Sequence, residues 1–399
     1  MLPTFPFNLL ISRLFTMARL DDVFSTELTR IAARGGARRL RGIERLAPGR
    51  VQRDGRELID FSSNDYLALS FAAPLRARAA QWALEYGAGA GASRLIGGTL
   101  DLHEQVEAKL AAWKRRPAAL VFASGWQANV AVLAALLGRD DLVFADRLVH
   151  ASLHHGVKAA GAREIRFRHN DLMHLEELLA THQARPGRRF ILTESVFSMD
   201  GDCADIVAIA ELAERFGAFF YLDEAHATGV LGEHGRGLAD ASVDLAMGTF
   251  SKAFGGFGAY VAGSRPLIDY LIHVCSGFIH TTAPPPSMLG AIDAALDLVP
   301  GMDHERAHLA DLAANLRSAL TEVEVNFGAS TTQIVPLIFG GAEETMRIAA
   351  GLEERGILGV AIRPPTVPDG TSRIRIALSS AHSAADVAHL VATLRDISH

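Results

Sequence analysis

A single lysine, Lys252, lies in the stretch GTFSKAFGGFG, residues 248–258, with no acidic residue beside it in the sequence. Lysine is rarely buried unless it is paired, yet its neighbours here are small or apolar and favour a packed environment. Burial disfavours the charged form of an amine and makes the neutral, nucleophilic form more available. The residue and its surroundings therefore favour a lysine that bonds covalently to a carbonyl group.

Several strand-like runs in the sequence end just before polar or glycine residues that could bind a ligand. In a parallel α/β sheet, ligands gather at the carboxyl ends of the strands, so these residues are expected at one rim. Taken singly, each has a structural explanation, because a carboxylate can cap a helix and a histidine can pack in a core. The residues are Gly125 and Trp126, His150, Ser198, Asp223 and His226, and Thr249 with Lys252.

The elements that must position these residues alternate between strand and helix. Helical stripes of apolar residues separate several strand-like runs, which predicts a mostly parallel, seven-stranded sheet with both faces covered. The fold class is therefore α/β. The strand-like runs occupy residues 119–124, 141–146, 164–169, 189–195, 218–223, 244–250 and 258–263.

The last part of the sequence predicts a second, smaller α/β unit. Strand-like runs at 334–339 and 372–378 accompany helical patterns at about 343–355 and 384–397. We therefore expect three domains. They are an N-terminal extension and arm at 1–60, a large domain carrying the rim residues at 61–290, and a C-terminal α/β domain at 291–399.

The composition is that of an ordinary globular protein, with 49% hydrophobic and 21% charged positions among 399 residues. A net charge of −6 gives no basic footprint for nucleic acid. Cys203 and Cys275 match neither a disulfide framework nor a zinc site, which favours a reducing, cytoplasmic location. The apolar start, interrupted by Arg13, is too short to span a membrane, and we expect residues 1–16 to be a dispensable extension or the result of an upstream start.

Taken together, the rim residues suit pyridoxal 5′-phosphate. The aldehyde of this cofactor needs a lysine amine, which Lys252 provides, and its pyridine nitrogen needs a carboxylate such as Asp223. Its phosphate needs backbone N–H groups at a helix start and a hydroxyl, which Gly125 and Thr249 provide. The large domain is therefore predicted to bind pyridoxal phosphate.

Long stretches of the sequence resemble the α-oxoamine synthases, a family of fold-type I pyridoxal-phosphate transferases. The resemblance covers about residues 20–397, and residues 360–380 are most similar to the branch that acts in biotin synthesis. It is carried by LDEAHATGVLGEHGRG (222–237) with GTFSKAFGG, and by FSSNDYLAL (61–69), GAGASRLIGGTLDLHEQVE (89–107), ADRLVHASL (145–153), NDLMHLE (170–176) and TESVFSMDGD (193–202).

The resemblance implies a role for each matching residue at the cofactor. Lys252 would form the covalent link and later remove the α-proton of the amino acid. Asp223 would pair with the ring nitrogen, His226 with the ring hydroxyl, and His150 would stack on the ring face. The remaining contacts implied are backbone N–H groups of Gly125 and Trp126 to the phosphate, the Thr249 hydroxyl to the phosphate, Ser198 to the polar edge of the ring, and Thr281 and Thr282 to the phosphate of a partner subunit.

The same resemblance implies the substrates and their contacts. Arg375, helped by Asn64, would bind the amino acid carboxylate, a task that suits a planar guanidinium. Thr366 and Arg38 would contact the acyl substrate. The implied reaction joins L-alanine to a pimeloyl thioester, carried by coenzyme A or an acyl-carrier protein, with loss of CO₂ and the thiol. A homodimer with a shared active site follows from the family and not from the composition.

Other functions remain open. A related family member would use glycine or another acyl-CoA, as 2-amino-3-ketobutyrate CoA ligase does, and a non-catalytic regulatory subunit would lack residues such as Lys252. The glycine run YGAGAGAS, residues 86–93, lacks the strand and acidic residue of a dinucleotide site. His154 and His155 are adjacent and have no ligand cluster, so no metal is expected.

Overall fold

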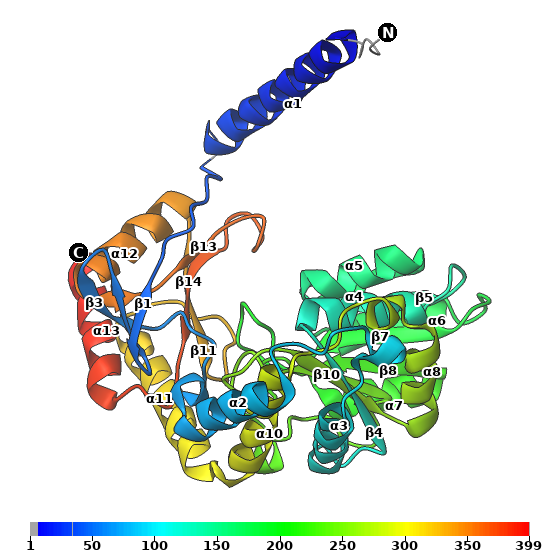
Figure 1. Cartoon of the computed structure of the whole chain (residues 1–399). Coiled ribbons are helices and arrows are strands. Elements are labelled where there is room, and N and C mark those ends of the chain that lie inside the picture. Colours follow the sequence, from blue (N-terminus) through cyan, green and yellow to red (C-terminus); the bar gives the residue numbers. More distant parts are fainter. Residues whose placement is uncertain (1–6, 34, 399) are drawn as a thin grey trace.

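The largest part of the molecule is built around one seven-stranded sheet, in a computed structural model that describes residues 7–33 and 35–398 (Figure 1). The strand order is β4-β10-β9-β8-β7-β5-β6. β10 is antiparallel to both of its neighbours and all other pairs are parallel, which confirms the predicted α/β class. The strands are β4 (Ala118–Phe122), β5 (Leu142–Asp146), β6 (Arg163–Phe167), β7 (Arg189–Glu194), β8 (Ala218–Asp223), β9 (Leu245–Thr249) and β10 (Ala259–Gly263).

Helices cover both faces of this sheet, because its strands are apolar on both sides. Along β4, Leu120 joins one hydrophobic cluster and Val121 joins the other, as the alternation of a strand requires. One cluster includes residues of α4 (Gly125–Leu136), α5 (Ala151–Ala160), α6 (Leu172–Thr181), α7 (Ile206–Phe216), α8 (Arg265–Val274) and α9 (Ser276–Ile279). The other includes residues of α2 (Ala73–Tyr86), α3 (Asp101–Trp113), α10 (Pro286–Leu298), α11 (Asp303–Glu322), α12 (Ala342–Glu354) and α13 (Ala384–Ser398).

Two smaller sheets lie outside the large one. A three-stranded sheet has the order β11-β14-β13, and a four-stranded sheet has the order β1-β2-β3-β12. β3 and β12 pair in parallel through Ile59 and Ile357, which ties the N-terminal arm to the C-terminal part. The predicted domain boundaries stay a prediction. The strands are β1 (Glu44–Ala47), β2 (Arg50–Arg53), β3 (Arg56–Asp60), β11 (Ile334–Gly340), β12 (Ile357–Leu358), β13 (Ala361–Ile362) and β14 (Ser372–Ala377).

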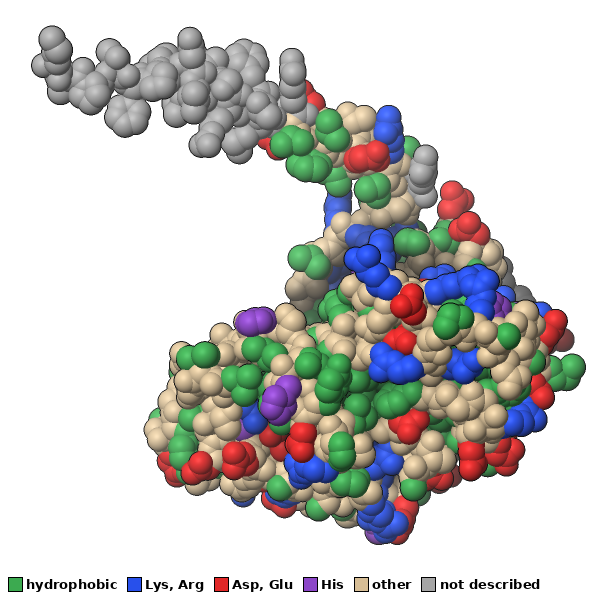
Figure 2. Space-filling model, turned by 90° about the vertical axis from the view of Figure 1, so that its right-hand side faces the viewer, with side chains coloured by type: hydrophobic (Ala, Val, Ile, Leu, Met, Phe, Trp, Pro, Cys, Tyr) green, Lys and Arg blue, Asp and Glu red, His purple; other side chains and the backbone are tan. Residues whose placement is uncertain are grey.

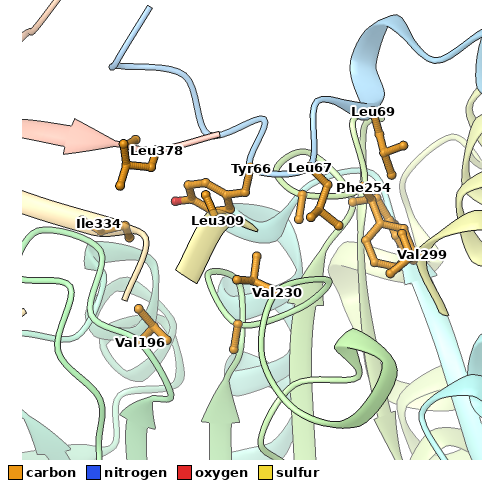
Figure 3. Packing of buried hydrophobic residues seen from close by; sticks show 14 of the residues in the cluster. Tyr66, Leu67, Leu69, Val196, Val230, Phe254, Val299, Leu309, Ile334 and Leu378 are labelled. Carbon is orange, nitrogen blue, oxygen red and sulfur yellow. The ribbon is translucent and has the colours of Figure 1, made fainter. Parts of the chain in front are cut away.

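A shared apolar core joins the large sheet to the C-terminal part. Figure 3 shows Tyr66 and Leu67 among residues from separate regions, with Ile334 and Leu378 on one side and Val230 below. Tyr66 is fully buried there. Its ring is therefore fixed by packing, and only its hydroxyl remains for polar contacts.

The N-terminal helix α1 (Phe7–Ala33) projects away from the rest of the molecule (Figure 1). Apolar side chains gather on its described portion (Figure 2), where they are exposed. Within residues 7–33 and 35–398, no helix combines the length and the apolar character needed to cross a bilayer. The predicted extension overlaps α1, and its first six residues lie outside the described part. The exposed apolar residues are Leu20, Val23, Phe24, Leu28 and Ile31.

Candidate active site

Lys252 and Asp223 lie at the ends of neighbouring strands, as predicted. Asp223 ends β8, and Lys252 follows β9, which pairs with β8. Both residues line one pocket at the carboxyl rim of the large sheet. The pocket is lined by Gly125, Trp126, Asn129, His150, Glu194, Asp223, Ala225, His226, Met247, Thr249, Ser251 and Lys252.

The carboxylate of Asp223 is buried and held in one orientation. Its Oδ2 accepts a hydrogen bond from Asn129 Nδ2 at 2.8 Å, and its Oδ1 accepts one from the Ala225 backbone at 2.9 Å. Asn129 is itself fixed by the hydroxyl of Tyr221, which donates to its Oδ1 at 2.7 Å. The strand end thus presents a fixed negative charge to the pocket.

The amine of Lys252 faces a neutral imidazole. Lys252 Nζ lies 2.9 Å from His226 Nε2. Burial lowers the pKa of Lys252 to about 8, against the raising effect of the Asp223 and Glu194 carboxylates. Burial, together with the charges of Lys252 and Arg375, holds the pKa of His226 well below its ordinary value. A neutral amine is therefore accessible near neutral pH, as the sequence context predicts.

His150 and Glu194 form the wall beside the amine. His150 Nδ1 lies 2.7 Å from the Ser152 hydroxyl, and the His150 backbone N–H donates to the Glu194 carboxylate. Burial lowers the pKa of His150, so its ring is neutral. Burial and the nearby charge of Asp223 raise the pKa of Glu194 well above its ordinary range. A flat, neutral ring at this position suits the face of an aromatic cofactor.

A second polar cluster, formed by Arg375, Asn64 and Tyr66, adjoins the pocket through His226. Arg375 donates to Asn64 Oδ1 at 2.9 Å, to the Tyr66 hydroxyl at 3.1 Å and to the backbone oxygen of Ser198. The Tyr66 hydroxyl also lies 2.7 Å from His226 Nδ1. These three acceptors of the guanidinium are all neutral. A buried guanidinium of this kind suits an incoming carboxylate.

The phosphate end of the predicted site is the start of α4. Ser124 caps this helix, since its side chain accepts from the Gln127 backbone at 3.3 Å. The N–H groups of Gly125 and Trp126 belong to the first turn, whose donors have no partner within the helix. The Thr249 hydroxyl donates to the Gly258 backbone oxygen at 2.8 Å, so its role at a phosphate stays a prediction.

Some predicted residues lie outside the lining of this pocket. Thr282 bridges to Ser93 on a separate segment, and Thr281 precedes it. Arg38 Nη2 lies 3.5 Å from Thr366 Oγ1, although 328 positions separate the two residues. Both of these side chains are exposed. Ser198 contributes its backbone oxygen to Arg375, whereas its predicted contact with the ring edge stays a prediction.

Two glycines near Lys252 lie where neighbouring segments leave no space for a side chain. A Cβ on Gly248 would come within 2.4 Å of the Tyr260 ring. Gly255 has φ +65°, and a Cβ there would come within 2.3 Å of the Ser70 backbone nitrogen. These glycines allow close packing of neighbouring segments, and the packing fixes the loop that carries Lys252.

The residues of the pocket fit pyridoxal phosphate. A half-buried amine, a fixed carboxylate and free helix N–H groups surround one cavity. Three further residues complete the site without having been predicted from the sequence, namely Tyr66, Asn129 and Glu194. Tyr66 and Glu194 stood inside FSSNDYLAL and TESVFSMDGD, so the motifs held a signal. For Asn129, the signal in the sequence was limited to its position, about one helical turn after Gly125.

Known proteins match this chain over most of its length. The family model for class I and II aminotransferases matches residues 56–394. The 8-amino-7-oxononanoate synthase of Gluconacetobacter diazotrophicus is 59% identical, covering 95% of this chain and 98% of the relative. The synthase of Anaeromyxobacter dehalogenans is 46% identical, covering 94% of each. The chain belongs to the 8-amino-7-oxononanoate synthase family.

Solved structures agree with this family. An 8-amino-7-oxononanoate synthase from Francisella tularensis matches with a TM-score of 0.74 at 28% identity, covering 85% of this chain and 97% of that chain. A serine palmitoyltransferase determined with its pyridoxal phosphate internal aldimine matches with a TM-score of 0.87 at 25% identity, covering 96% and 98%. The predicted family, fold-type I fold, acyltransferase class and pyridoxal phosphate cofactor are thereby confirmed.

Proposed function

We propose that this chain joins L-alanine to a pimeloyl thioester, of coenzyme A or acyl-carrier protein, to give 8-amino-7-oxononanoate, CO₂ and the free thiol. The observation that carries the proposal is the hydrogen-bonded series from Lys252 through His226 and Tyr66 to Arg375. It places an amine close to a guanidinium whose hydrogen-bond partners, among the residues that the structure describes, are all neutral. An amino acid bound with its carboxylate on Arg375 would present its Cα towards Lys252.

When bound, pyridoxal 5′-phosphate supplies an aldehyde that links to an amine and a cationic ring that withdraws electrons from Cα. Asp223 would pair with the ring nitrogen and keep it protonated. Lys252, whose pKa burial lowers to about 8, would hold the cofactor and would take the α-proton of the amino acid. His150 would support the ring face, and His226 would contact the ring hydroxyl. Arg375 and Asn64 orient the substrate carboxylate, which is later lost as CO₂.

We assign the acyl end of the substrate to the surface formed by Arg38 and Thr366, beside the N-terminal arm. Arg38 and Thr366 meet there, which supports their predicted contact with the thioester. Arg363 donates to the backbone oxygens of Gly35 and Ala37 and so holds the arm in place. The depth of this region would select the acyl chain.

A homodimer is part of the proposal. The apolar groove beside the pocket is exposed in the single chain, with 48% of Trp126 and 40% of Val274 accessible. Ile96, near Thr282, is 82% exposed. A second copy on this face would cover these side chains and bring Thr281 and Thr282 towards the partner's phosphate. A cytoplasmic location is also proposed, supported by two cysteines that form no disulfide.

The test is an assay of the purified protein with pyridoxal phosphate. L-alanine with pimeloyl-CoA should yield 8-amino-7-oxononanoate, identified by mass, whereas glycine or a shorter acyl-CoA should react much more slowly. Lys252→Ala should give no product and should lack the absorbance band of the covalently bound cofactor. A preference for glycine would replace L-alanine in the proposal, and full activity in Lys252→Ala would overturn it.

A further inference from the structure

One histidine outside the pocket, His169, lies between two carboxylates from separate segments, one at the end of β5 and one in the segment after β7. Its Nδ1 is 3.0 Å from Asp146 Oδ1, and its Nε2 is 2.8 Å from Asp202 Oδ2. The ring packs edge-on against Phe197, with the centroids 4.4 Å apart. Asn170 also contacts both carboxylates, because its backbone N–H donates to Asp146 and its side-chain amide donates to Asp202.

The charges in this cluster fix the state of the imidazole. Burial alone would lower the pKa of His169, but the hydrogen bonds to Asp146 and Asp202 outweigh it and raise the pKa to about 10. Both ring nitrogens therefore carry protons at neutral pH and both donate. One positive charge is shared by two carboxylates, of which Asp146 is fully buried.

Asp146 organises the loop that leads to His150. It is the last residue of β5, and its carboxylate accepts from the Leu148 backbone at 2.8 Å. Its backbone oxygen accepts from the Val149 N–H at 3.2 Å. The chain then reaches His150, which caps α5 and lines the pocket. The position of the His150 ring thus depends on how Asp146 is held.

Asp202 closes the turn of residues 197–202 on the other side. Its backbone oxygen accepts from the Phe197 N–H at 3.0 Å. Within the turn, the backbone oxygen of Ser198 accepts from Arg375. Asp200 accepts from Arg373 at 2.6 Å. This turn is therefore the support against which the guanidinium of Arg375 is oriented.

We propose that His169 is a positioning residue that ties the His150 loop to the turn of residues 197–202 and so sets the cofactor-ring and carboxylate subsites together. The inference deepens the proposed function and rests on it for the roles of His150 and Arg375. The NDLMHLE motif, whose first residue is Asn170, directly follows His169 in the sequence. His169 and Asn170 thus have a structural task although neither residue lines the pocket.

The main test is His169→Asn, measured at a temperature well below unfolding. Without the imidazolium, the Asp146 and Asp202 carboxylates lose the positive charge they share, and only the contacts of Asn170 still join the two segments. The dissociation constant for pyridoxal phosphate in the apoprotein should rise about tenfold. The dissociation constant for L-alanine, measured from the absorbance change that it induces, should rise by a similar factor, because small displacements are costly in such sites. A loss of thermal stability with both constants within twofold of the parent would overturn the proposal.

His234→Asn is the matched control. His234 also faces carboxylates, Glu233 and Asp303, but it is exposed and contacts the Pro300 backbone away from the pocket. Its backbone has φ +54°, which asparagine tolerates. Both dissociation constants should stay at the parent values. A rise equal to that of His169→Asn would show that any histidine–carboxylate contact has this effect and would overturn the proposal.

Asp202→Asn tests the contact of His169 with the turn of residues 197–202 separately from its contact with the His150 loop. This variant also replaces His169→Asn as the test if His169→Asn does not fold. Asp202→Asn leaves the contact of His169 with Asp146 intact and weakens only the side-chain contacts that tie His169 and Asn170 to the turn that supports Arg375. The constant for L-alanine should therefore rise more than the constant for the cofactor, and the reverse order would overturn the proposal. Cofactor binding is measured without substrate. If the parent protein fails to use L-alanine, the proposed function is refuted, but the effect of His169→Asn on cofactor binding still tests the role of His169.

Discussion

At the scale of single residues, Lys252 shows how surroundings prepare a side chain for chemistry. A lysine in water keeps its proton to about pH 10.5, whereas burial beside the pocket lowers the pKa of Lys252 to about 8. The neutral amine, which attacks the aldehyde, is thus the minor form below pH 8 and the major form above it. The rate at which apoprotein takes up pyridoxal phosphate, followed by absorbance, should rise with a midpoint near pH 8. A midpoint above pH 10 would contradict the assignment.

Arg375→Ala should weaken amino acid binding selectively. Hydrogen bonds to charged groups contribute about 1.5–3 kcal/mol, so KM for L-alanine should rise about tenfold or more. The dissociation constant for the cofactor should change little, because Arg375 does not line its pocket. Steady-state kinetics and absorbance titration measure the two values. An unchanged KM would make Arg375 a structural residue.

Tyr66→Phe should cost stability as well as activity. The change leaves the pocket volume intact but leaves Arg375 and His226 each without one partner. A buried polar group without a partner costs about 1–3 kcal/mol, which urea unfolding would detect. Tyr86→Phe is the control, because Tyr86 is half exposed on α2 and its loss of a hydroxyl should leave the midpoint unchanged.

The residue types of the pocket were largely predictable from the sequence. Lys252, Asp223 and His226 stand in long motifs at strand ends, and the structure brings them together. The roles of Tyr66 and Asn129 were not predictable, because they arise from contacts across the fold. Asn129, for example, contacts Asp223, 94 positions away. Sequence spacing contains no information on such pairs until the sheet order is known.

At the scale of elements, the loop after β8 is folded around a buried ion pair. Lys114 Nζ lies 2.6 Å from Glu224 Oε2, and both side chains are almost inaccessible. Glu224 also accepts from the backbone of Ala239 at 2.8 Å, which closes the loop of residues 224–239. Asp223 and His226 stand at the start of that loop. The ion pair therefore holds the loop whose first residues line the pocket.

Lys114→Met should destabilise the protein strongly. It leaves the Glu224 carboxylate buried without its counter-ion, and breaking a buried pair costs about 3–5 kcal/mol. Urea unfolding should show a lower midpoint. Arg115→Met is the control, because the pair of Arg115 with Glu233 is exposed on both sides and its removal should leave the midpoint unchanged. Equal midpoints for the two variants would contradict this account.

The strands of the large sheet were predictable and the N-terminal hairpin was not. The run at 218–223 coincides with β8, and the other six runs match their strands within one or two residues at each end. The apolar character of all of them except the edge strand β6 reflects burial on both faces, whereas β6 is charged and partly exposed. β1 is exposed along its whole length and rich in charge, so it has no hydrophobic pattern to recognise. Its strand character comes from pairing with β2.

At the scale of the whole molecule, the exposed groove beside the pocket predicts the assembly. Ala134→Glu places a charge in the groove without disturbing the core of the single chain. If a second copy covers this face, the mass in sedimentation should fall from that of a dimer towards that of one chain. Val207→Glu, on the exposed side of α7, should leave the mass unchanged. A dimer that survives Ala134→Glu would place the interface elsewhere.

The pairing of β3 with β12 has a consequence for how the chain acquires its structure. Ile59 meets Ile357, so the arm cannot complete its sheet until nearly three hundred further residues have left the ribosome. Contacts of such high sequence separation slow folding, and the large sheet, whose strands are closer in sequence, can form first. During synthesis the edge of β3 would stay open. A slow final phase of refolding, or a dependence on chaperones, would therefore reflect the formation of this sheet. A circularly permuted chain in which β3 and β12 are closer in sequence should complete that phase faster.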